Sequence, residues 1–234
     1  MRFVLLLLLA FRAGAAEVRV FAAASLTEAL EEIACGYERE TKDRVVFNFG
    51  ASSMLARQIE AGAPADLLLS ADDLVRTSRL GERASFLSNT LVVIVPRDGG
   101  RRITQPRDLI GLKVALAEPS TVPAGIYARR YLQKVGLWDR VKRNVIPTDN
   151  VRAALAAVEA GNVDAAIVYR TDARVSKEVR VAYAVPRGQG PRIAYLFAVI
   201  ADAEQPRAAR RFFAHLRSQR AIAIFEKHGF DVVR

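Results

Sequence analysis

The stretch FAAASLTEAL, residues 21–30, changes its character halfway along. Its first half is small and apolar, as in a buried strand, and its second half has apolar residues at helical spacing, Leu26 and Leu30. Ser25 stands where the two halves meet. Serine is a favoured helix N-cap, and with Glu28 three residues later it fits a capping box. The stretch therefore predicts a strand that leads directly into a helix, with a hydroxyl at the turn.

The same alternation of strand and helix continues along the chain and restarts after residue 96. A β-α-β order of this kind predicts a parallel sheet covered by helices, and thus an α/β fold. No Pro-, Gly- or Ser-rich linker divides the two halves, which favours two lobes joined by continuous strands. The expected strands are 18–24, 44–50, 65–71, 89–96, 112–120, 142–148, 163–169, 179–186 and 192–200, and the expected helices are 26–41, 52–62, 123–137, 150–161 and 206–229.

The chain is expected to cross between the lobes near residues 88–91 and again near 186–192. The first lobe is then discontinuous, formed by residues 17–89 and 190–234, and the second lobe spans 90–189. A chain of 234 residues with 51% hydrophobic residues is large enough to build both cores.

The N-terminus has the pattern of a secretory signal peptide. Arg2 is followed by an apolar run at residues 3–11, and small residues at 13–16 fit a cleavage site. The run is shorter than the roughly 20 apolar residues that a membrane-spanning helix needs. We therefore expect residues 1–16 to be removed and the mature protein to be periplasmic.

The chain is basic, with a formal net charge of +10 that falls to +8 when the leader with Arg2 and Arg12 is removed. The arginines are scattered over helix faces without a block of five like charges, which favours a solvated surface. Export also argues against a nucleic-acid partner. The single cysteine, Cys35, excludes an internal disulfide and is expected to be a small buried residue.

Four of the expected helices begin directly after strands, two in each lobe. Helix N-termini carry unpaired N–H groups and partial positive charge, so they bind anions without help from Lys or Arg. In open α/β sheets, ligands bind at this edge, and facing lobes would bring the four starts to one cleft. Ordinary capping explains each start taken singly, so only their combination indicates a site. The starts are Ser25, Ser52–Ser53, 123–125 and 148–150.

Six segments together resemble the periplasmic molybdate-binding proteins of ABC transporters, over nearly the whole mature chain. Three motifs are specific as a set: FAAASL at 21–26, AGAPAD at 61–66 and VPAGIYA at 122–128. The resemblance implies the type II periplasmic binding protein fold, in which two α/β lobes enclose a ligand cleft and move about a hinge. The segments are VFAAASLTEAL, QIEAGAPADLLLSAD, NTLVVIVP, EPSTVPAGIYA with YLQKVGLWD, NVRAALAAVEAGNVDAAIVYRTDA and FEKHGF.

In that family a tetrahedral oxyanion is held by serine hydroxyls, backbone N–H groups and a tyrosine hydroxyl, without basic residues. The matched motifs imply that the ligand contacts fall on Ser25, Ser52, Ala124, Val151 and Tyr169. Ala124 and Val151 would act through their backbone N–H groups, which explains apolar residues in an anion site. The metal of the oxyanion would be bound through its oxygens, with no direct protein–metal bond and no separate cofactor.

The sequence departs from the family pattern at three places. Ala117-Glu118 stand where the family often has Gly-Asp, and Arg170 follows the matched tyrosine directly. Ser53 follows Ser52, so the serine assignment could shift by one residue. None of these changes removes a hydrogen-bond donor.

A site made only of donors suits molybdate, which is a dianion at pH 7 with only acceptor oxygens. Hydrogen phosphate carries a proton, and leaving its O–H unpaired in a closed cleft costs roughly 1–3 kcal/mol. Tungstate is nearly the same size as molybdate and is expected to bind too. Sulfate differs only in size, so a binding protein for sulfate or another small oxyanion is the alternative. The expected partner is a membrane permease, and the protein is expected to be a monomer.

Two other classes of protein fit the sequence less well. The segment GASSM at 50–54 is not a G-x-S-x-G nucleophile elbow, and no Cys/His metal spacing or phosphate-binding loop is present, which argues against an enzyme. His215 and His228 lie in the closing helix, away from the strand-to-helix turns. The effector-binding lobes of a transcription factor are opposed by the leader and by the absence of a helix-turn-helix extension.

Overall fold

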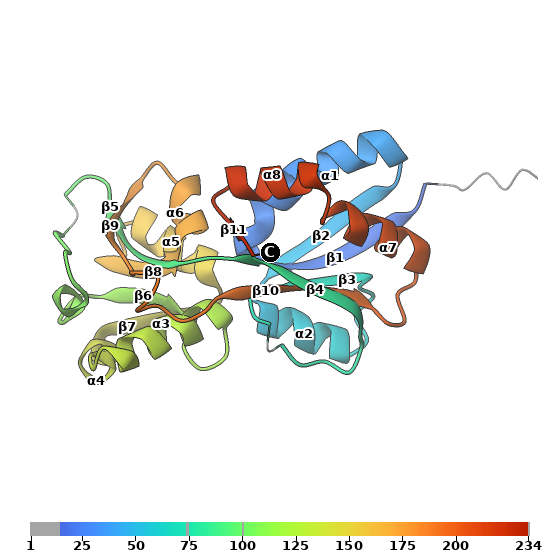
Figure 1. Cartoon of the computed structure of the whole chain (residues 1–234). Coiled ribbons are helices and arrows are strands. Elements are labelled where there is room, and N and C mark those ends of the chain that lie inside the picture. The colour runs from blue at the N-terminus through green and yellow to red at the C-terminus, as the bar shows by residue number, and fades with distance from the viewer. Residues whose placement is uncertain (1–14, 74, 100, 234) are drawn as a thin grey trace, which may run out of the picture.

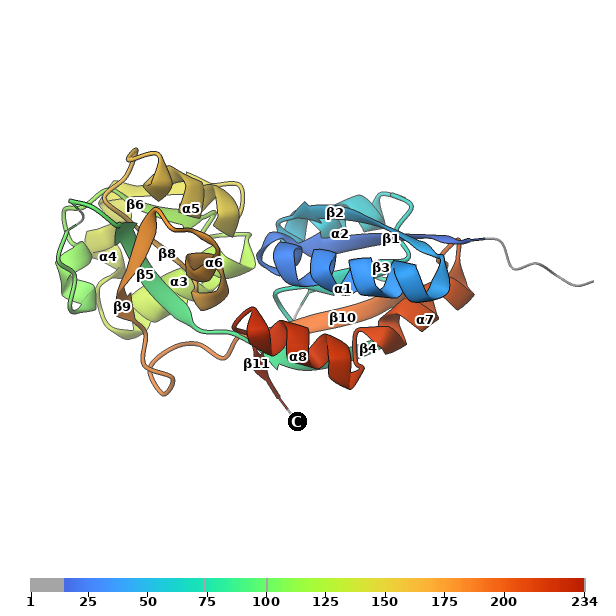
Figure 2. The same ribbon diagram turned by 90° about the horizontal axis from the view of Figure 1, so that it is seen from above.

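The computed structural model describes residues 15–73, 75–99 and 101–233, so residues 1–14 of the expected leader lie outside the described part. The chain forms two sheets that lie side by side, each covered by helices on both faces (Figures 1 and 2). The larger sheet has the order β11-β4-β10-β3-β1-β2, with β1 at Glu17–Ala23, β2 at Arg44–Gly50, β3 at Leu67–Ser70, β4 at Leu80–Ser88, β10 at Ala194–Ile200 and β11 at Asp231–Val232. The smaller sheet has the order β7-β6-β8-β5-β9, with β5 at Leu91–Pro96, β6 at Val114–Ala117, β7 at Val145–Thr148, β8 at Ala165–Tyr169 and β9 at Val179–Ala184.

Helices cover each sheet. Each sheet with its helices is called below the larger-sheet lobe or the smaller-sheet lobe. The larger sheet is covered by α1 (Thr27–Thr41), α2 (Ser52–Glu60), α7 (Pro206–His215) and α8 (Gln219–Lys227). The smaller sheet is covered by α3 (Pro123–Lys134), α5 (Val151–Glu159) and α6 (Arg170–Val175), and the short α4 (Trp138–Val141) packs against α3. Short 3₁₀ turns are η1 (Ala24–Leu26), η2 (Pro106–Leu109) and η3 (Lys142–Asn144).

Both sheets mix parallel and antiparallel strands, which corrects the expectation of purely parallel sheets. β1 is parallel to β2 and β3, and β6 is parallel to β7 and β8. β10 is antiparallel to β3 and β4, and β5 is antiparallel to β8 and β9. β5 and β10 are the strands by which the chain arrives from the other lobe. They enter their sheets at the edge where the parallel strands end, so they run in the opposite direction.

The structure also contains helices and strands that the sequence pattern does not predict, β4, β11, α4 and α6, and it divides the expected closing helix in two. β4 is not among the expected strands, because its sequence LGERASFLS carries exposed Glu82 and Arg83 in place of a continuous apolar run. The expected closing helix 206–229 is two helices, since Ser218 caps α8 by accepting the N–H of Ala221 at 3.2 Å.

The helices pack through the faces that their apolar spacing predicts. In α1, Leu30, Ile33 and Tyr37 are buried in the core of the larger-sheet lobe. Cys35 points away from that face and is exposed, so the expectation that it is buried is wrong. None of the helices in the described ranges has the length and apolar character needed to cross a membrane. The fold thus brings the starts of η1, α2, α3 and α5 to the junction of the two lobes.

Candidate functional site

A small cavity of about 20 Å³ lies at this junction, between the two sheets. Its wall consists of the first turns of η1, α2, α3 and α5 together with the end of β8. The structure brings all five predicted site residues to this one cavity: Ser25, Ser52, Ala124, Val151 and Tyr169. The other residues that line it are small or apolar, apart from Asn150. Among the described residues that form the wall, none carries a charge.

Ser25 lies in η1, and its hydroxyl makes no capping hydrogen bond, so the capping box expected with Glu28 is absent. Its Oγ instead lies 3.0 Å from the hydroxyl oxygen of Tyr195 on β10. Glu28 turns to the other lobe, where its carboxylate pairs with Arg152 on α5. Ser25 is therefore held at the cavity by a tertiary contact and not by its own helix.

Ser52 occupies the first position of α2, after Ala51 as the N-cap. Its Oγ accepts the backbone N–H of Ala71 at 2.9 Å. A backbone amide can only donate, so the hydroxyl hydrogen of Ser52 is left for another acceptor. Ser53 lines two wider grooves outside the small cavity, and its own hydroxyl has no hydrogen-bond partner in the part of the chain that the structure describes. The geometry thus distinguishes the two serines.

Ala124 and Val151 present the first turns of α3 and α5, where helix N–H groups have no intrahelical partner. α3 can approach β6 closely because Gly125 has no side chain: a Cβ there would lie 1.9 Å from the carbonyl oxygen of Ala117. In α5, the side chain of Asn150 caps the helix by accepting the N–H groups of the next turn, from Arg152 and Ala153.

Tyr169 ends β8 and is 1% exposed. Its hydroxyl is buried and has no hydrogen-bond partner among the described residues. Burial raises the pKa of this phenol well above its ordinary value, so the group keeps its hydrogen at neutral pH. A buried polar group without a partner is costly, and such groups call for a specific explanation. A hydrogen-bond acceptor bound in the cavity would satisfy this hydroxyl.

The charges nearest the cavity neutralise one another. Arg152 follows Val151 directly and binds both oxygens of Glu28, at 2.8 and 2.5 Å. Its Nε lies 2.7 Å from Oδ1 of Asp172, which is fully buried. Burial raises the pKa of Asp172 to about 6, although the neighbouring Arg152 acts in the opposite direction. The cluster joins the two lobes, and the described residues that line the cavity include no cation.

Arg170, noted as a departure from the family pattern, points away from the cavity. Its guanidinium donates to the carbonyl of Gly229 and to the carboxylate of Asp231, both at 2.9 Å. Since Arg170 belongs to α6 and Asp231 to β11, this pair also links the two lobes.

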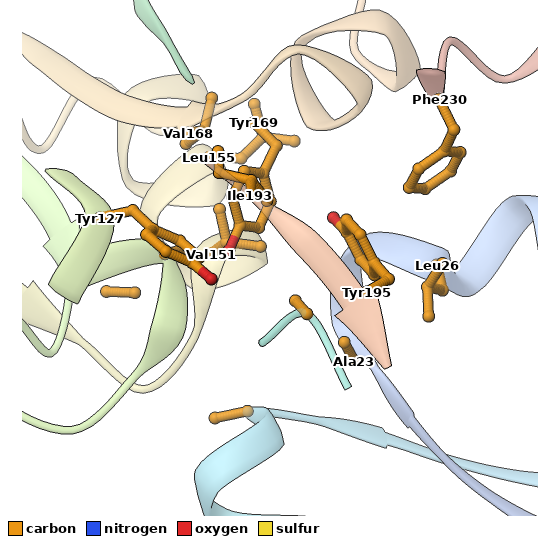
Figure 3. Packing of buried hydrophobic residues seen from close by; sticks show 14 of the residues in the cluster. Ala23, Leu26, Tyr127, Val151, Leu155, Val168, Tyr169, Ile193, Tyr195 and Phe230 are labelled. Atoms are coloured by element: carbon orange, nitrogen blue, oxygen red, sulfur yellow. The ribbon is translucent and has the colours of Figure 1, made fainter. Parts of the chain in front are cut away.

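Two polar residues that no sequence pattern marks lie behind the site: Tyr195 contacts Ser25, and Asn89 contacts Tyr195. Tyr195 is fully buried on β10, and Asn89 lies between β4 and β5, at the first crossing. Figure 3 shows Tyr195 beside Ala23 and Leu26 of the larger-sheet lobe, with Tyr169 on the other side. An aromatic residue in the apolar run of β10 is ordinary, so no local pattern marks Tyr195 as part of a site.

Residues 18–231 match the family model described as bacterial extracellular solute-binding protein. The chain is 37% identical over 230 residues to the molybdate-binding protein ModA of Escherichia coli (strain K12), covering 92% of this chain and 89% of ModA.

Two solved structures share the fold. The periplasmic molybdate-binding protein of Azotobacter vinelandii has a TM-score of 0.82 at 21% identity, over 93% of this chain and all of that one. The sulfate-binding protein SubI of Mycobacterium tuberculosis also has a TM-score of 0.82, at 18% identity, over 93% of this chain and 87% of SubI. The chain therefore belongs to the bacterial extracellular solute-binding proteins, a family of binding proteins and not of enzymes.

Proposed function

We propose that this protein binds molybdate, and tungstate as well, for delivery to an ABC transporter. One observation carries the proposal: a cavity lined by residues of both lobes holds, among helix N-termini, the hydroxyl of Tyr169, which has no hydrogen-bond partner in the described part of the chain. Such a wall offers donors and no charge, which suits a dianion with only acceptor oxygens. The similarity over most of the chain to ModA, whose name states molybdate binding, supports the same ligand.

In this proposal five residues hold the oxyanion. The hydroxyls of Ser25, Ser52 and Tyr169 donate to its oxygens, and the backbone N–H groups of Ala124 and Val151 donate from the starts of α3 and α5. Because Ser25 and Ser52 belong to one lobe and the other three to the second, all five contacts exist only when the lobes are closed. The ligand therefore shifts the population toward the closed form by a hinge motion.

Selection against phosphate follows from the chemistry of the wall. None of the described residues that line the cavity is a carboxylate, so the proton of hydrogen phosphate has no charged acceptor there. An unpaired O–H in the closed cavity costs roughly 1–3 kcal/mol.

Sulfate is the second candidate ligand. It is a dianion with the same acceptors, and the sulfate-binding protein SubI has the same fold as this chain. Cavity size is then the property that separates sulfate from molybdate.

We further propose that the protein is exported and acts in the periplasm. Residues 1–16 act as a signal peptide, the mature protein works as a periplasmic monomer, and its closed form docks on a membrane permease. The family description, extracellular solute-binding protein, supports this location.

The test is calorimetric titration of the dialysed mature protein with molybdate, tungstate, sulfate and phosphate in turn. Tight binding of molybdate and tungstate, with little heat from the other two, is the expected result. Equal binding of sulfate would make the protein a general oxyanion receptor, and no binding of molybdate would overturn the proposal.

A further inference from the structure

Asn89 is a buried polar residue at the crossing between the lobes, and its amide orientation is fixed by its neighbours. It is 3% exposed, and its Oδ1 accepts the backbone N–H of Thr90 at 2.9 Å. Because that N–H can only donate, the other end of the amide is the nitrogen. Nδ2 then donates to Oγ1 of Thr171 at 2.9 Å and to the hydroxyl of Tyr195 at 3.2 Å.

The hydroxyl of Tyr195 thus receives one hydrogen bond and has its own hydrogen left to donate. Tyr195 is fully buried, and within the described ranges its hydroxyl has one further hydrogen-bond neighbour, Oγ of Ser25 at 3.0 Å. Burial raises the pKa of Tyr195 above its ordinary value, so the phenol keeps its hydrogen. The bond between the two hydroxyls therefore runs from Tyr195 to Ser25.

As a result, Ser25 accepts a hydrogen bond from the protein and has its own hydrogen free at the cavity. Ser52 is in the same position, because its Oγ accepts the N–H of Ala71. A hydroxyl can donate or accept as it rotates. Each serine at the cavity is thus supplied with a donor from behind, which leaves it to donate toward the ligand.

We propose that Tyr195 is a positioning residue that fixes Ser25 as a donor and thereby sets the preference for oxyanions that carry no proton. This inference rests on the proposed function and deepens it. An oxyanion with an O–H, such as hydrogen phosphate, needs an acceptor in the wall, and a free serine hydroxyl could rotate to supply one. While Tyr195 donates to Ser25, a Ser25 hydroxyl that accepted from such a ligand would not have Tyr195 as an acceptor for its own hydrogen, which disfavours that arrangement. A residue that does not itself line the cavity thereby contributes to discrimination against protonated oxyanions.

The test is Tyr195→Phe, which removes the hydroxyl and keeps the ring. That ring packs edge-on against Phe230, with the two ring centroids 5.4 Å apart. Affinity is measured by titration with molybdate and by competition of phosphate against molybdate at pH 7. Molybdate affinity is expected to fall about 10-fold, the size of one ordinary hydrogen bond. Phosphate affinity is expected to stay constant or rise, so the ratio of the two dissociation constants narrows at least 10-fold.

The matched control is Tyr183→Phe. Tyr183 also bonds to a tyrosine hydroxyl, that of Tyr131 at 3.3 Å, and lies on β9 away from the cavity. This variant is expected to leave the ratio of the dissociation constants for phosphate and molybdate unchanged. In a Ser25→Ala background, Tyr195→Phe should no longer change the ratio, because the hydroxyl that it orients is gone.

The outcomes separate this inference from the proposed function. If the affinities of Tyr195→Phe for molybdate and phosphate fell equally, or if neither changed, the role of Tyr195 would be overturned. The proposal that the wild-type protein binds molybdate would still stand. A wild-type protein that fails to bind molybdate would overturn the proposed function and this inference with it. Thermal unfolding of each variant verifies that it is folded at the temperature of the titration.

Discussion

At the scale of single residues, the site depends on which hydroxyl hydrogens already form hydrogen bonds within the protein. Three hydroxyls lie at the cavity, and that of Tyr169 has no hydrogen-bond partner among the residues that the structure describes. Ser25 and Ser52 have partners that donate to them, from Tyr195 and Ala71. A sequence motif specifies that a hydroxyl is present, and its neighbours decide whether that hydroxyl donates.

Replacing Ser52 by Ala tests this point. The change removes one donor to the ligand and leaves the buried N–H of Ala71 without its acceptor. We expect molybdate affinity to fall about 10-fold or more and the free energy of unfolding to fall by about 1–3 kcal/mol. Calorimetric titration and urea unfolding measure the two effects.

Ser53→Ala is the matched control, because Ser53 is adjacent, has an unpartnered hydroxyl and lies outside the cavity. Its affinity for molybdate should stay within about twofold of the wild type, since no bond is lost. A larger loss in Ser53→Ala than in Ser52→Ala would show that the serine assignment is shifted by one residue.

At the scale of elements, helix starts must be placed to within a fraction of a hydrogen-bond length. The start of α3 lies against the end of β6, and Gly125 permits the contact: a Cβ would lie 1.9 Å from the carbonyl oxygen of Ala117. The start of α5 is fixed by its Asn150 cap. These local features aim the first N–H groups of two helices at the cavity.

Replacing Gly125 by Ala should therefore displace the start of α3 and its donor at Ala124. We expect a loss of roughly 1–3 kcal/mol in the free energy of unfolding, as for overpacking elsewhere, and a loss of molybdate affinity of about 10-fold. Gly188→Ala is the control, because Gly188 has open space around its Cβ position and no positive φ. Equal affinity in both variants would contradict the role of Gly125.

At the scale of the whole molecule, ion pairs across the junction hold the two lobes together. Arg152 on α5 binds Glu28 on α1 through both oxygens, and Asp172 on α6 supports the same guanidinium. Arg170 makes a second link, to Asp231 of β11. These contacts stabilise the arrangement in which residues of both lobes line one cavity.

Glu28→Gln should weaken closure without unfolding either lobe. The pair is only partly buried, so the effect is modest, and we expect molybdate affinity to fall about threefold to 10-fold. Small-angle X-ray scattering should show a larger radius of gyration for the ligand-free variant than for the wild type. Glu40→Gln is the control, because it removes an exposed pair with Arg220 inside one lobe. If both variants behave alike, the pair between Glu28 and Arg152 does not govern closure.

The buried Asp172 predicts a pH dependence of stability. Burial, opposed by Arg152, raises its pKa from 3.8 to about 6 in the folded protein, so the unfolded chain releases this proton first as the pH rises. The contribution of protonated Asp172 to the stability of the folded protein is complete below about pH 4 and is lost as the pH rises through about 6. Relative to Asp172→Asn, the wild-type free energy of unfolding should fall by up to about 3 kcal/mol over this range. Urea unfolding measures the free energy of unfolding of both proteins between pH 4 and 7. If this free energy changed equally with pH in the wild type and in Asp172→Asn, the raised pKa of Asp172 would be contradicted.

The sequence by itself determined the α/β class, most of the strands and helices, and the five residues that now line one cavity. These features depend on short-range patterns: apolar periodicity, small residues at turns, and a serine or proline at a helix start. The tertiary structure alone decided the antiparallel direction of β5 and β10, the break before α8, and the partners of Ser25 and Glu28. Ser25 and Tyr195 are 170 residues apart, and Glu28 and Arg152 are 124 residues apart. No local pattern encodes such pairs, because the free energy that selects them is gained only when segments far apart in the chain pack together.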